Sequence, residues 1–194
     1  MKVSAIIVTR GDVDLHPIVD SLPPEWELVT WDNSGKISVN GCRLTTQSAC
    51  DLGVYGRYKA LAYATHDVIF VQDDDCILAN PANIVAAYEP GVVTYNMPYA
   101  FRDGGVDSVM VGFGACFDKH LPQQAFDRWF AGEGHGMDAV FKRTCDVVFT
   151  TLTPTKMIHE PIELLDYSYA ENRMWQQPGH QEERRMIHDL ALKA

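Results

Sequence analysis

Three consecutive aspartates, Asp73, Asp74 and Asp75, are the residues of this sequence best suited to chemistry. Neighbouring carboxylates repel one another unless a cation lies among them. Alternate side chains of an extended chain point the same way, so Asp73 and Asp75 can share one partner while Asp74 points elsewhere. Ligand sets made only of oxygen atoms suit Mg²⁺ or Mn²⁺. The run therefore predicts a site for such an ion, with a solvated acidic turn as the alternative.

The segment that must position these acids is the apolar run Val-Ile-Phe-Val of residues 68–71. A short apolar run bounded by polar residues is typical of a fully buried strand. The acids then lie at the carboxyl end of this strand. Because ligands of open α/β sheets bind beyond the carboxyl ends of the strands, the same edge is the predicted binding site.

Two earlier strands are predicted to end in polar turns as well. Residues 2–9 are rich in β-branched residues and stop at Arg10-Gly11-Asp12, and residues 25–31 stop at Asp32-Asn33-Ser34-Gly35. A helix is predicted between them, from about residue 13 to residue 22. The order strand, helix, strand favours a parallel pair with a right-handed crossover. The expected fold class is therefore α/β, with an open, mostly parallel twisted sheet flanked by helices in a single domain.

The remaining elements follow from the hydrophobic pattern and from the positions of glycine and proline. The sequence predicts helices over residues 56–65, 80–89, 123–130, 137–143 and 181–194, and strands over residues 91–96, 107–117 and 146–151. Asn80 and Pro81 suit the N-cap and the first position of a helix. Gly112 and Gly114 indicate a bent strand or a close approach of the backbone to a ligand.

Composition limits the class of protein. The 194 residues fit one domain with a sizeable core, and 46% hydrophobic and 22% charged residues are ordinary for a soluble globular protein. The net charge of −10 disfavours a general affinity for nucleic acid or anionic membranes. Five cysteines without a CxxC pair suggest reduced thiols, and the apolar run at the N-terminus is too short for a signal peptide or a membrane span. We therefore expect a cytoplasmic protein without a membrane span.

Four stretches resemble the glycosyltransferases of the GT-A fold, closest to the family-2 type. In order along the chain they are VSAIIVTRGD, ELVTWDNS, GRYKALAYATHDVIFVQDDD and GEGHGMDAVFKR. The motifs are short, so their order and spacing carry the resemblance. It implies a nucleotide-sugar-binding and catalytic domain over residues 1–160. Residues 161–194 would form a C-terminal helical tail and a candidate lid.

The resemblance implies that Asp73 and Asp75 hold Mn²⁺ or Mg²⁺, bridging the two phosphates of a nucleotide-sugar, most often a UDP-sugar. The ion would offset the negative charge that develops on the leaving diphosphate. Asp75 is the preferred direct ligand. Asp73 either binds the metal directly as well, or contacts the ribose, or reaches the metal through water. Many GT-A enzymes add a histidine to the metal from the region that His159 occupies here; a purely structural histidine is an equally good interpretation.

The resemblance also indicates where the donor would bind. Base and ribose are expected at the ends of the first two strands, the phosphates near the acids, and the sugar over two glycines that let it approach the backbone. The donor-binding candidates are Thr9, Arg10, Asp12, Asp32, Arg57, Asp74, Gly112 and Gly114. Helix capping, turn formation and a solvated helix face are the alternatives for the polar residues among them.

A catalytic base is expected in the stretch from residue 132 to residue 143. It resembles the family's acidic motif at a helix start, where a carboxylate takes the proton of the acceptor hydroxyl, which implies inversion at the sugar carbon. Asp138 matches best and Glu133 is the fallback, although the family shows two or more acids where this chain has Gly-Met-Asp. A first-turn residue favoured by the helix dipole is the alternative for Asp138.

The tail offers a candidate lid over the diphosphate, formed by Asn172, Arg173 and His180 around Trp175. A mobile basic and aromatic segment of this kind would exclude water from the donor. The alternative is a helix that docks onto the domain through Met174 and Trp175.

These observations favour a metal-dependent, inverting glycosyltransferase that uses a nucleotide-diphosphate sugar and an unidentified acceptor: a glycan, a protein, a lipid-linked glycan or a modified nucleobase. A sugar-1-phosphate nucleotidylyltransferase is one alternative, but its glycine-rich loop after the first strand is reduced here to a single glycine in residues 9–12. A phosphatase with an Asp-x-Asp nucleophile fits the mid-chain position of the acids poorly. A non-catalytic relative that binds sugar-nucleotides or carbohydrate remains the third alternative.

Overall fold

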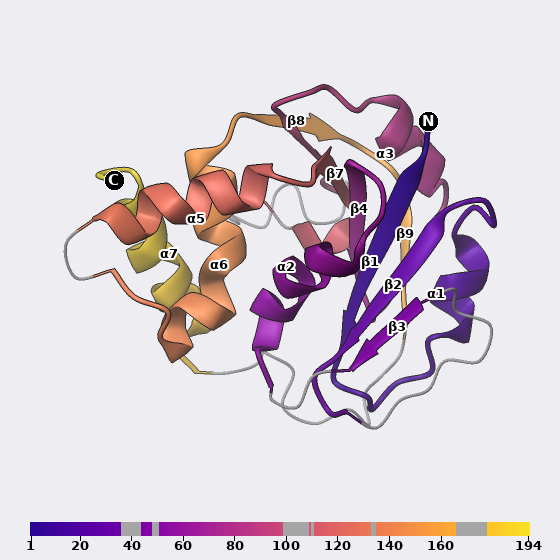
Figure 1. The fold of residues 1–194 in the computed structure, drawn as a ribbon, viewed down its shortest axis with the longest axis horizontal. Helices are drawn as coiled ribbons and strands as arrows, with labels where there is room; N and C mark the ends of the chain where they lie inside the picture. Colours follow the sequence, from indigo (N-terminus) through magenta and orange to yellow (C-terminus); the bar gives the residue numbers. More distant parts are fainter. Residues whose placement is uncertain (36–43, 48–50, 99–108, 110, 133–134, 166–177) are drawn as a thin grey trace.

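The computed structural model describes residues 1–35, 44–47, 51–98, 109, 111–132, 135–165 and 178–194, and for residues 44–47 only the backbone. The described chain forms one seven-stranded sheet with helices on both faces (Figure 1). Its strands, in spatial order, are β3 (Leu44–Gln47), β2 (Glu27–Asp32), β1 (Val3–Thr9), β4 (Val68–Asp73), β7 (Ala115–Asp118), β6 (Val93–Asn96) and β8 (Thr155–Ile158).

The helices divide between the two faces of the sheet (Figure 1). Two short helices, α1 (His16–Ser21) and α3 (Pro81–Ala86), pack on one face. The other face carries α2 (Gly56–Ala60), α5 (Leu121–Ala131), α6 (Ala139–Leu152) and α7 (His180–Ala191). Three single 3-10 turns complete this side: η1 (Gly53–Tyr55), η2 (Leu61–Tyr63) and η3 (Val111–Phe113).

The central strand β4 shows how the sequence assigns its side chains to these faces. Ile69 and Val71 are buried in the core beneath α2, α5 and α6, while Phe70 is buried in the core beneath α1 and α3. Since side chains alternate along a strand, Asp73 follows Ile69 and Val71 toward the face that carries α2 and α6. The last side chain of the strand is therefore directed toward α2 and α6, and away from the face that carries α1.

The sheet has its topological switch point between β1 and β4. The chain runs from β1 outward through the parallel strands β2 and β3, and then returns to pair β4 in parallel with the other edge of β1. In this register Val8 lies opposite Asp73, and Thr9 lies opposite Asp32. The carboxyl ends of β1, β2 and β4 therefore meet at the point where open α/β sheets bind their ligands.

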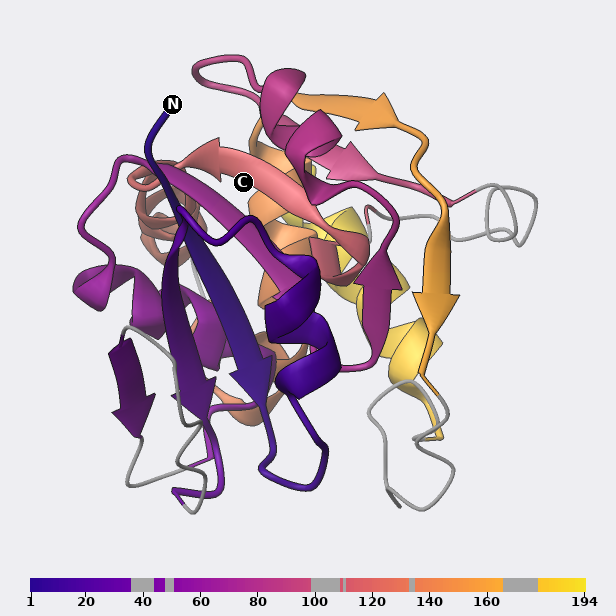
Figure 2. The same cartoon turned by 90° about the vertical axis from the view of Figure 1, so that its right-hand side faces the viewer.

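A second, two-stranded sheet holds the turn that follows β4. Strand β5 (Cys76–Leu78) pairs with β9 (Ile162–Leu164) in antiparallel fashion, and the two lie side by side in Figure 2. The backbone N–H of Leu165 donates to the carbonyl oxygen of Asp75 at 2.9 Å. The Gln72 amide closes the turn from the other side by donating to the Cys76 carbonyl at 2.6 Å. The acidic turn is thus fixed by a segment about ninety residues further along the chain.

The α/β fold class and the mostly parallel sheet predicted from the sequence are confirmed. The predicted strand over residues 146–151 is wrong, because these residues form the second half of α6. A run of β-branched and apolar residues suits a strand and a buried helix equally well. The three-to-four spacing of Phe141, Cys145, Val148 and Phe149, all buried, decides for the helix.

Two further predictions need correction. The single bent strand expected over residues 107–117 is, where the structure describes it, the turn η3 followed by β7, with the bend at Gly114, whose φ is +103°. Asn80 precedes α3 as predicted, but its side chain makes no capping hydrogen bond, and Pro81 alone defines the start of the helix. Within the described residues no helix is both long and apolar enough to cross a bilayer.

Candidate active site

A cavity of about 640 Å³ opens at the switch point of the sheet. Its walls come from the end of β1, residues 51–54, α2, the acidic turn after β4, η3, and the facing sides of α6 and α7. Eight of the predicted site residues line it: Thr9, Arg10, Arg57, Asp73, Asp74, Asp75, Gly112 and His180. The residues predicted at the ends of β1 and β4 therefore share one cavity with Gly112, the glycine that was expected to lie beneath a sugar.

The three aspartates of the acidic turn all border the cavity but differ in environment. The Asp73 side chain is 40% exposed, whereas Asp74 is buried at 5%. Asp75 is half-buried and is anchored through its backbone by Leu165. The turn therefore offers two partly accessible carboxylates, Asp73 and Asp75, on alternate positions, as its sequence predicts.

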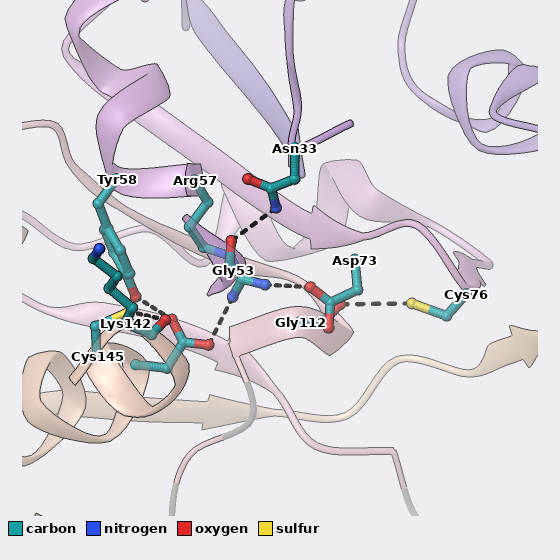
Figure 3. A network of polar contacts seen from close by, with 10 residues as sticks. Asn33, Gly53, Arg57, Tyr58, Asp73, Cys76, Gly112, Lys142 and Cys145 are labelled. Atoms are coloured by element: carbon teal, nitrogen blue, oxygen red, sulfur yellow. Dashed lines mark hydrogen bonds and ion pairs between the residues drawn. The ribbon is translucent and has the colours of Figure 1, made fainter. Parts of the chain in front are cut away.

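Arg57 of α2 is a buried cation of this site (Figure 3). Its guanidinium is only 2% exposed and lies between two carboxylates. One nitrogen, Nη2, donates to Oδ1 of Asp73, and the other, Nη1, donates to Oδ2 of Asp146 at 2.8 Å. The Tyr58 hydroxyl donates to the second oxygen of Asp146. This network joins α2, α6 and the end of β4, so the orientation of Asp73 is set by residues from three elements.

The pKa values of this network reflect burial first and the ion pairs second. Burial lowers the pKa of Arg57, but Asp146 and Asp73 raise it by more, so the guanidinium stays charged. Burial raises the pKa of the Asp146 carboxyl, and Arg57 and Tyr58 offset this only in part. The folded network therefore depends on the Arg57 charge to keep Asp146 ionised at neutral pH.

Gly112 lies directly against the Asp73 carboxylate (Figure 3). A Cβ atom built on Gly112 would fall 1.9 Å from Oδ2 of Asp73 and 2.4 Å from its Cγ, far inside any contact distance. The glycine is therefore required for the close approach of the carboxylate and not for an unusual φ. The sequence indicated a close approach of the backbone to a ligand here, and the group that lies against the Gly112 backbone is the Asp73 carboxylate.

Asn33 is a site-forming residue that sequence analysis treated only as a turn former. Its side chain donates to the Gly53 carbonyl at 3.0 Å and accepts from the Leu52 backbone N–H at 3.0 Å and from the Trp31 indole at 3.1 Å. It therefore ties residues 51–54, one wall of the cavity, to the end of β2. Its neighbour Asp32 is fully buried and accepts from the backbone N–H and the hydroxyl of Ser34 at 2.8 and 2.7 Å.

Most of the cavity wall formed by α6 and α7 was missed from the sequence, and His180 is its one predicted residue. The lining residues of α6 are Ala139, Lys142, Arg143 and Asp146, spaced by three and four residues as one helix face requires. On α7 the lining residues are His180 and Arg184, four residues apart. The signal was present as a polar stripe beside the apolar one, but it is visible only once residues 146–151 are known to be helical.

Several predicted site residues lie outside the cavity lining. Asp12, Asp32, Gly114, Asp138 and His159 do not border it. Asp138 is the N-cap of α6, where its carboxylate accepts from the Phe141 backbone N–H at 2.8 Å, as the alternative interpretation expected. The Gly114 position faces Leu78 and Ile84 in the core. Glu133, Asn172 and Arg173 lie outside the described residues.

The predicted metal ligands do not form one cluster with His159. The ring nitrogen Nδ1 of His159 lies 2.7 Å from the Met97 carbonyl oxygen. The backbone N–H of the following residue, Glu160, donates to Oδ1 of Asn96 at 2.7 Å. These contacts hold His159 in the connection between β8 and β9. Across the part of the chain that the structure describes, no three His, Cys, Asp or Glu side chains come together closely enough to hold a metal ion.

Comparison with known proteins finds similar structures but no similar sequence family. No protein-family model and no curated protein matches the chain. Among solved structures it is similar to S. aureus TarS 1-349 in complex with UDP-GlcNAc, with a TM-score of 0.61 and 11% identity over 98% of this chain. It is also similar to S. aureus TarS 1-349 without that ligand, with a TM-score of 0.53 and 13% identity over 81% of this chain.

The match covers the shared core and not the whole of the longer protein. The chain spans 66% and 58% of those two TarS chains. The match with the UDP-GlcNAc complex extends over 98% of this chain. The chain therefore has the GT-A fold.

Proposed function

We propose that this protein is a glycosyltransferase that moves a sugar from a nucleotide-diphosphate sugar, of the UDP-sugar class, to an acceptor hydroxyl. One observation carries the proposal: the acidic turn Asp73–Asp75 and the end of β1 border a single cavity at the switch point of a GT-A sheet. A cavity of about 640 Å³ is within the usual range for a ligand the size of a nucleotide-sugar. The UDP-GlcNAc bound by S. aureus TarS, a protein of the same fold, supports the choice of donor.

The acidic turn fits a hard divalent cation. Mg²⁺ and Mn²⁺ are bound through one or two carboxylates together with water and substrate phosphates, so a third protein ligand is not required. Asp73 and Asp75 supply the carboxylates, and we propose that they hold the ion. When bound, the ion would offset the charge of the departing diphosphate. Arg57 keeps one oxygen of Asp73 engaged and so leaves the other for this role.

In the proposed reaction the acceptor oxygen attacks the sugar carbon that bears the diphosphate. The new carbon–oxygen bond forms while the bond to the diphosphate oxygen breaks, and the nucleoside diphosphate leaves with the bonding electron pair. The acceptor loses its proton to a carboxylate. A single displacement of this kind inverts the configuration at the sugar carbon. The cavity walls from α6 and α7 would exclude water, which otherwise competes with the acceptor.

Asp138 is the proposed base, because it precedes Ala139, the first cavity-lining residue of α6. Its capping bond gives a control that separates catalysis from stability. Asparagine caps a helix as well as aspartate does but accepts no proton, so we expect Asp138→Asn to keep the melting temperature and lose transfer. Asp138→Ala should in addition lose about 1 kcal/mol of unfolding free energy. Transfer at the wild-type rate by Asp138→Asn would exclude Asp138 as the base.

The proposed function is tested by donor binding. We expect UDP-GlcNAc to raise the melting temperature of the wild-type protein in the presence of Mn²⁺, because a ligand that binds only the folded state stabilises it. Asp75→Ala should abolish the metal-dependent part of this shift. Calorimetric titration of UDP-GlcNAc with Mn²⁺ and with EDTA gives the affinities.

The matched control is Asp67→Ala. Asp67 is an exposed aspartate at the opposite end of β4, so its removal changes the net charge equally without touching the cavity. It should leave both the shift and the affinity unchanged. If the wild-type protein binds UDP-sugars with the same affinity in Mn²⁺ and EDTA, the metal role fails; if it binds none, the proposed function fails.

A further inference from the structure

The cavity brings five cationic side chains together with five aspartates in a chain that is acidic overall. The net charge is −10, yet five of the 16 lysines and arginines lie among the 20 residues that line this cavity. These five are Arg10, Arg57, Lys142, Arg143 and Arg184. The lining also holds Asp51, Asp73, Asp74, Asp75 and Asp146, so it is formally neutral where the whole chain carries −10. An anionic ligand therefore meets less repulsion in this cavity than the net charge suggests.

Contacts within the described residues hold Arg57 and Arg143 to carboxylates. Arg57 is held between Asp73 and Asp146. Arg143 of α6 forms a two-point ion pair with Glu183 of α7, at 2.6 and 3.1 Å. The ammonium group of Lys142, in contrast, forms no hydrogen bond or ion pair with any residue in the described ranges.

The Arg143–Glu183 pair fixes the two neighbouring cations relative to each other. Lys142 precedes Arg143 on α6, and Arg184 follows Glu183 on α7. Both helices are anchored in the core, α7 through Ile187 and Ala191. Lys142 and Arg184 therefore reach the cavity from two helices that are cross-linked one residue away.

His180 adds an unsatisfied polar atom to the same wall. The residue is 7% exposed, lines the cavity, and its Nδ1 atom is buried without a hydrogen-bond partner among the described residues. Burial lowers the pKa of His180, which keeps the ring neutral at physiological pH. A buried ring nitrogen without a partner is costly, and a neutral imidazole has one N–H with which it can donate to an acceptor oxygen. His180 is also the first residue of the twelve-residue helix α7, whose N-terminal dipole favours an anion.

We propose that Lys142, His180 and Arg184 bind the diphosphate group of the nucleotide donor. The inference rests on the proposed function and names the residues of the same cavity that hold the donor's charge. Ammonium, guanidinium and imidazole N–H groups all donate to phosphate oxygens, and donors from two helices suit two linked phosphates. The carboxylates of the acidic turn would repel the diphosphate without these cations.

The test is calorimetric titration of inorganic pyrophosphate, in EDTA, into the full chain and into Lys142→Ala and Arg184→Ala. We expect the wild-type protein to bind pyrophosphate without metal and each variant to bind it about tenfold more weakly, as expected for loss of a charged hydrogen bond. Arg184→Lys should recover part of the affinity. Arg185→Ala is the matched control, because Arg185 is exposed, adjacent, and outside the cavity lining.

Three results would overturn the inference: equal weakening in Arg184→Ala and Arg185→Ala, unchanged affinity in both cavity variants, or no binding of pyrophosphate to the wild-type protein. Titration of UDP-GlcNAc separates this inference from the proposed function. UDP-GlcNAc bound equally by wild type, Lys142→Ala and Arg184→Ala overturns the anion site and leaves the function standing. Pyrophosphate binding that depends on both residues, in a protein that binds no nucleotide-sugar, supports the anion site and excludes the function.

Discussion

Arg57→Met should lower the free energy of unfolding by about 3–5 kcal/mol, the usual cost of removing one partner from a buried ion pair. Methionine fills a similar volume, so the loss comes from the charge and not from a cavity. Asp146, buried in α6, is left without its cation, whereas Asp73 can turn toward solvent. Unfolding in guanidinium chloride, followed by circular dichroism, measures the change.

The controls for Arg57→Met use the same chain. Arg143→Met breaks an ion pair whose side chains are 35% and 30% exposed, and it should cost no more than about 1 kcal/mol. The double variant Arg57→Met/Asp146→Leu should recover most of the stability, because both buried charges are then absent. A single variant as stable as the wild type would mean that the Arg57 charge does not hold the network together.

The pH dependence of Arg57→Met follows from the raised pKa of Asp146, which burial causes and Arg57 partly offsets. Without Arg57 that pKa rises further. An acid whose pKa is raised by folding stabilises the folded state at low pH and loses this contribution as the pH rises through the raised pKa. The difference in stability between Arg57→Met and wild type should therefore be small near pH 4 and large at pH 7.

Gly112→Ala should weaken metal-dependent binding of UDP-GlcNAc by about 10- to 100-fold, corresponding to the 1.5–3 kcal/mol of a hydrogen bond to a charged group. The new methyl group would overlap the Asp73 carboxylate, which must rotate away and lose its contact with Arg57. The fold should persist, because Asp73 is 40% exposed and has solvent to move into. Calorimetric titration with Mn²⁺ measures the affinity.

Gly136→Ala is the control for Gly112→Ala. A Cβ on Gly136 meets no atom within 4 Å, and neither glycine has a positive φ. The control should therefore bind UDP-GlcNAc as the wild type does. Wild-type affinity in Gly112→Ala would show that the observed position of Asp73 is not needed for donor binding.

The parts of the fold that the sequence predicted are those governed by local pattern. The apolar run before Asp73 and the polar residues after Thr9 and Trp31 indicate where three parallel strands end. Topology then brings these ends together, since neighbouring parallel strands share one carboxyl edge. This is why the acidic turn and the end of β1 were placed in one site without any contact being known.

The helical half of the site could not be predicted in the same way. Arg57, Asp146 and Arg184 meet through the packing of three helices that are far apart in sequence. The sequence predicted Arg57 as a ligand-binding residue and did not indicate that Asp73 and Asp146 would hold it, the latter in a segment predicted to be a strand. The local sequence around an arginine or an aspartate does not show whether its charge is buried in an ion pair or exposed to solvent.

The pairing of β5 with β9 has a consequence for synthesis of the chain on the ribosome. The turn that carries Asp75 gains its backbone anchor only when Leu165 has been made, and the cavity gains Arg184 later still. Contacts that join residues this far apart form slowly, because a long loop must close first. A nascent chain that has completed the seven-stranded sheet should therefore already be protected from proteolysis in β1 and β4 while it is still unable to retain a donor.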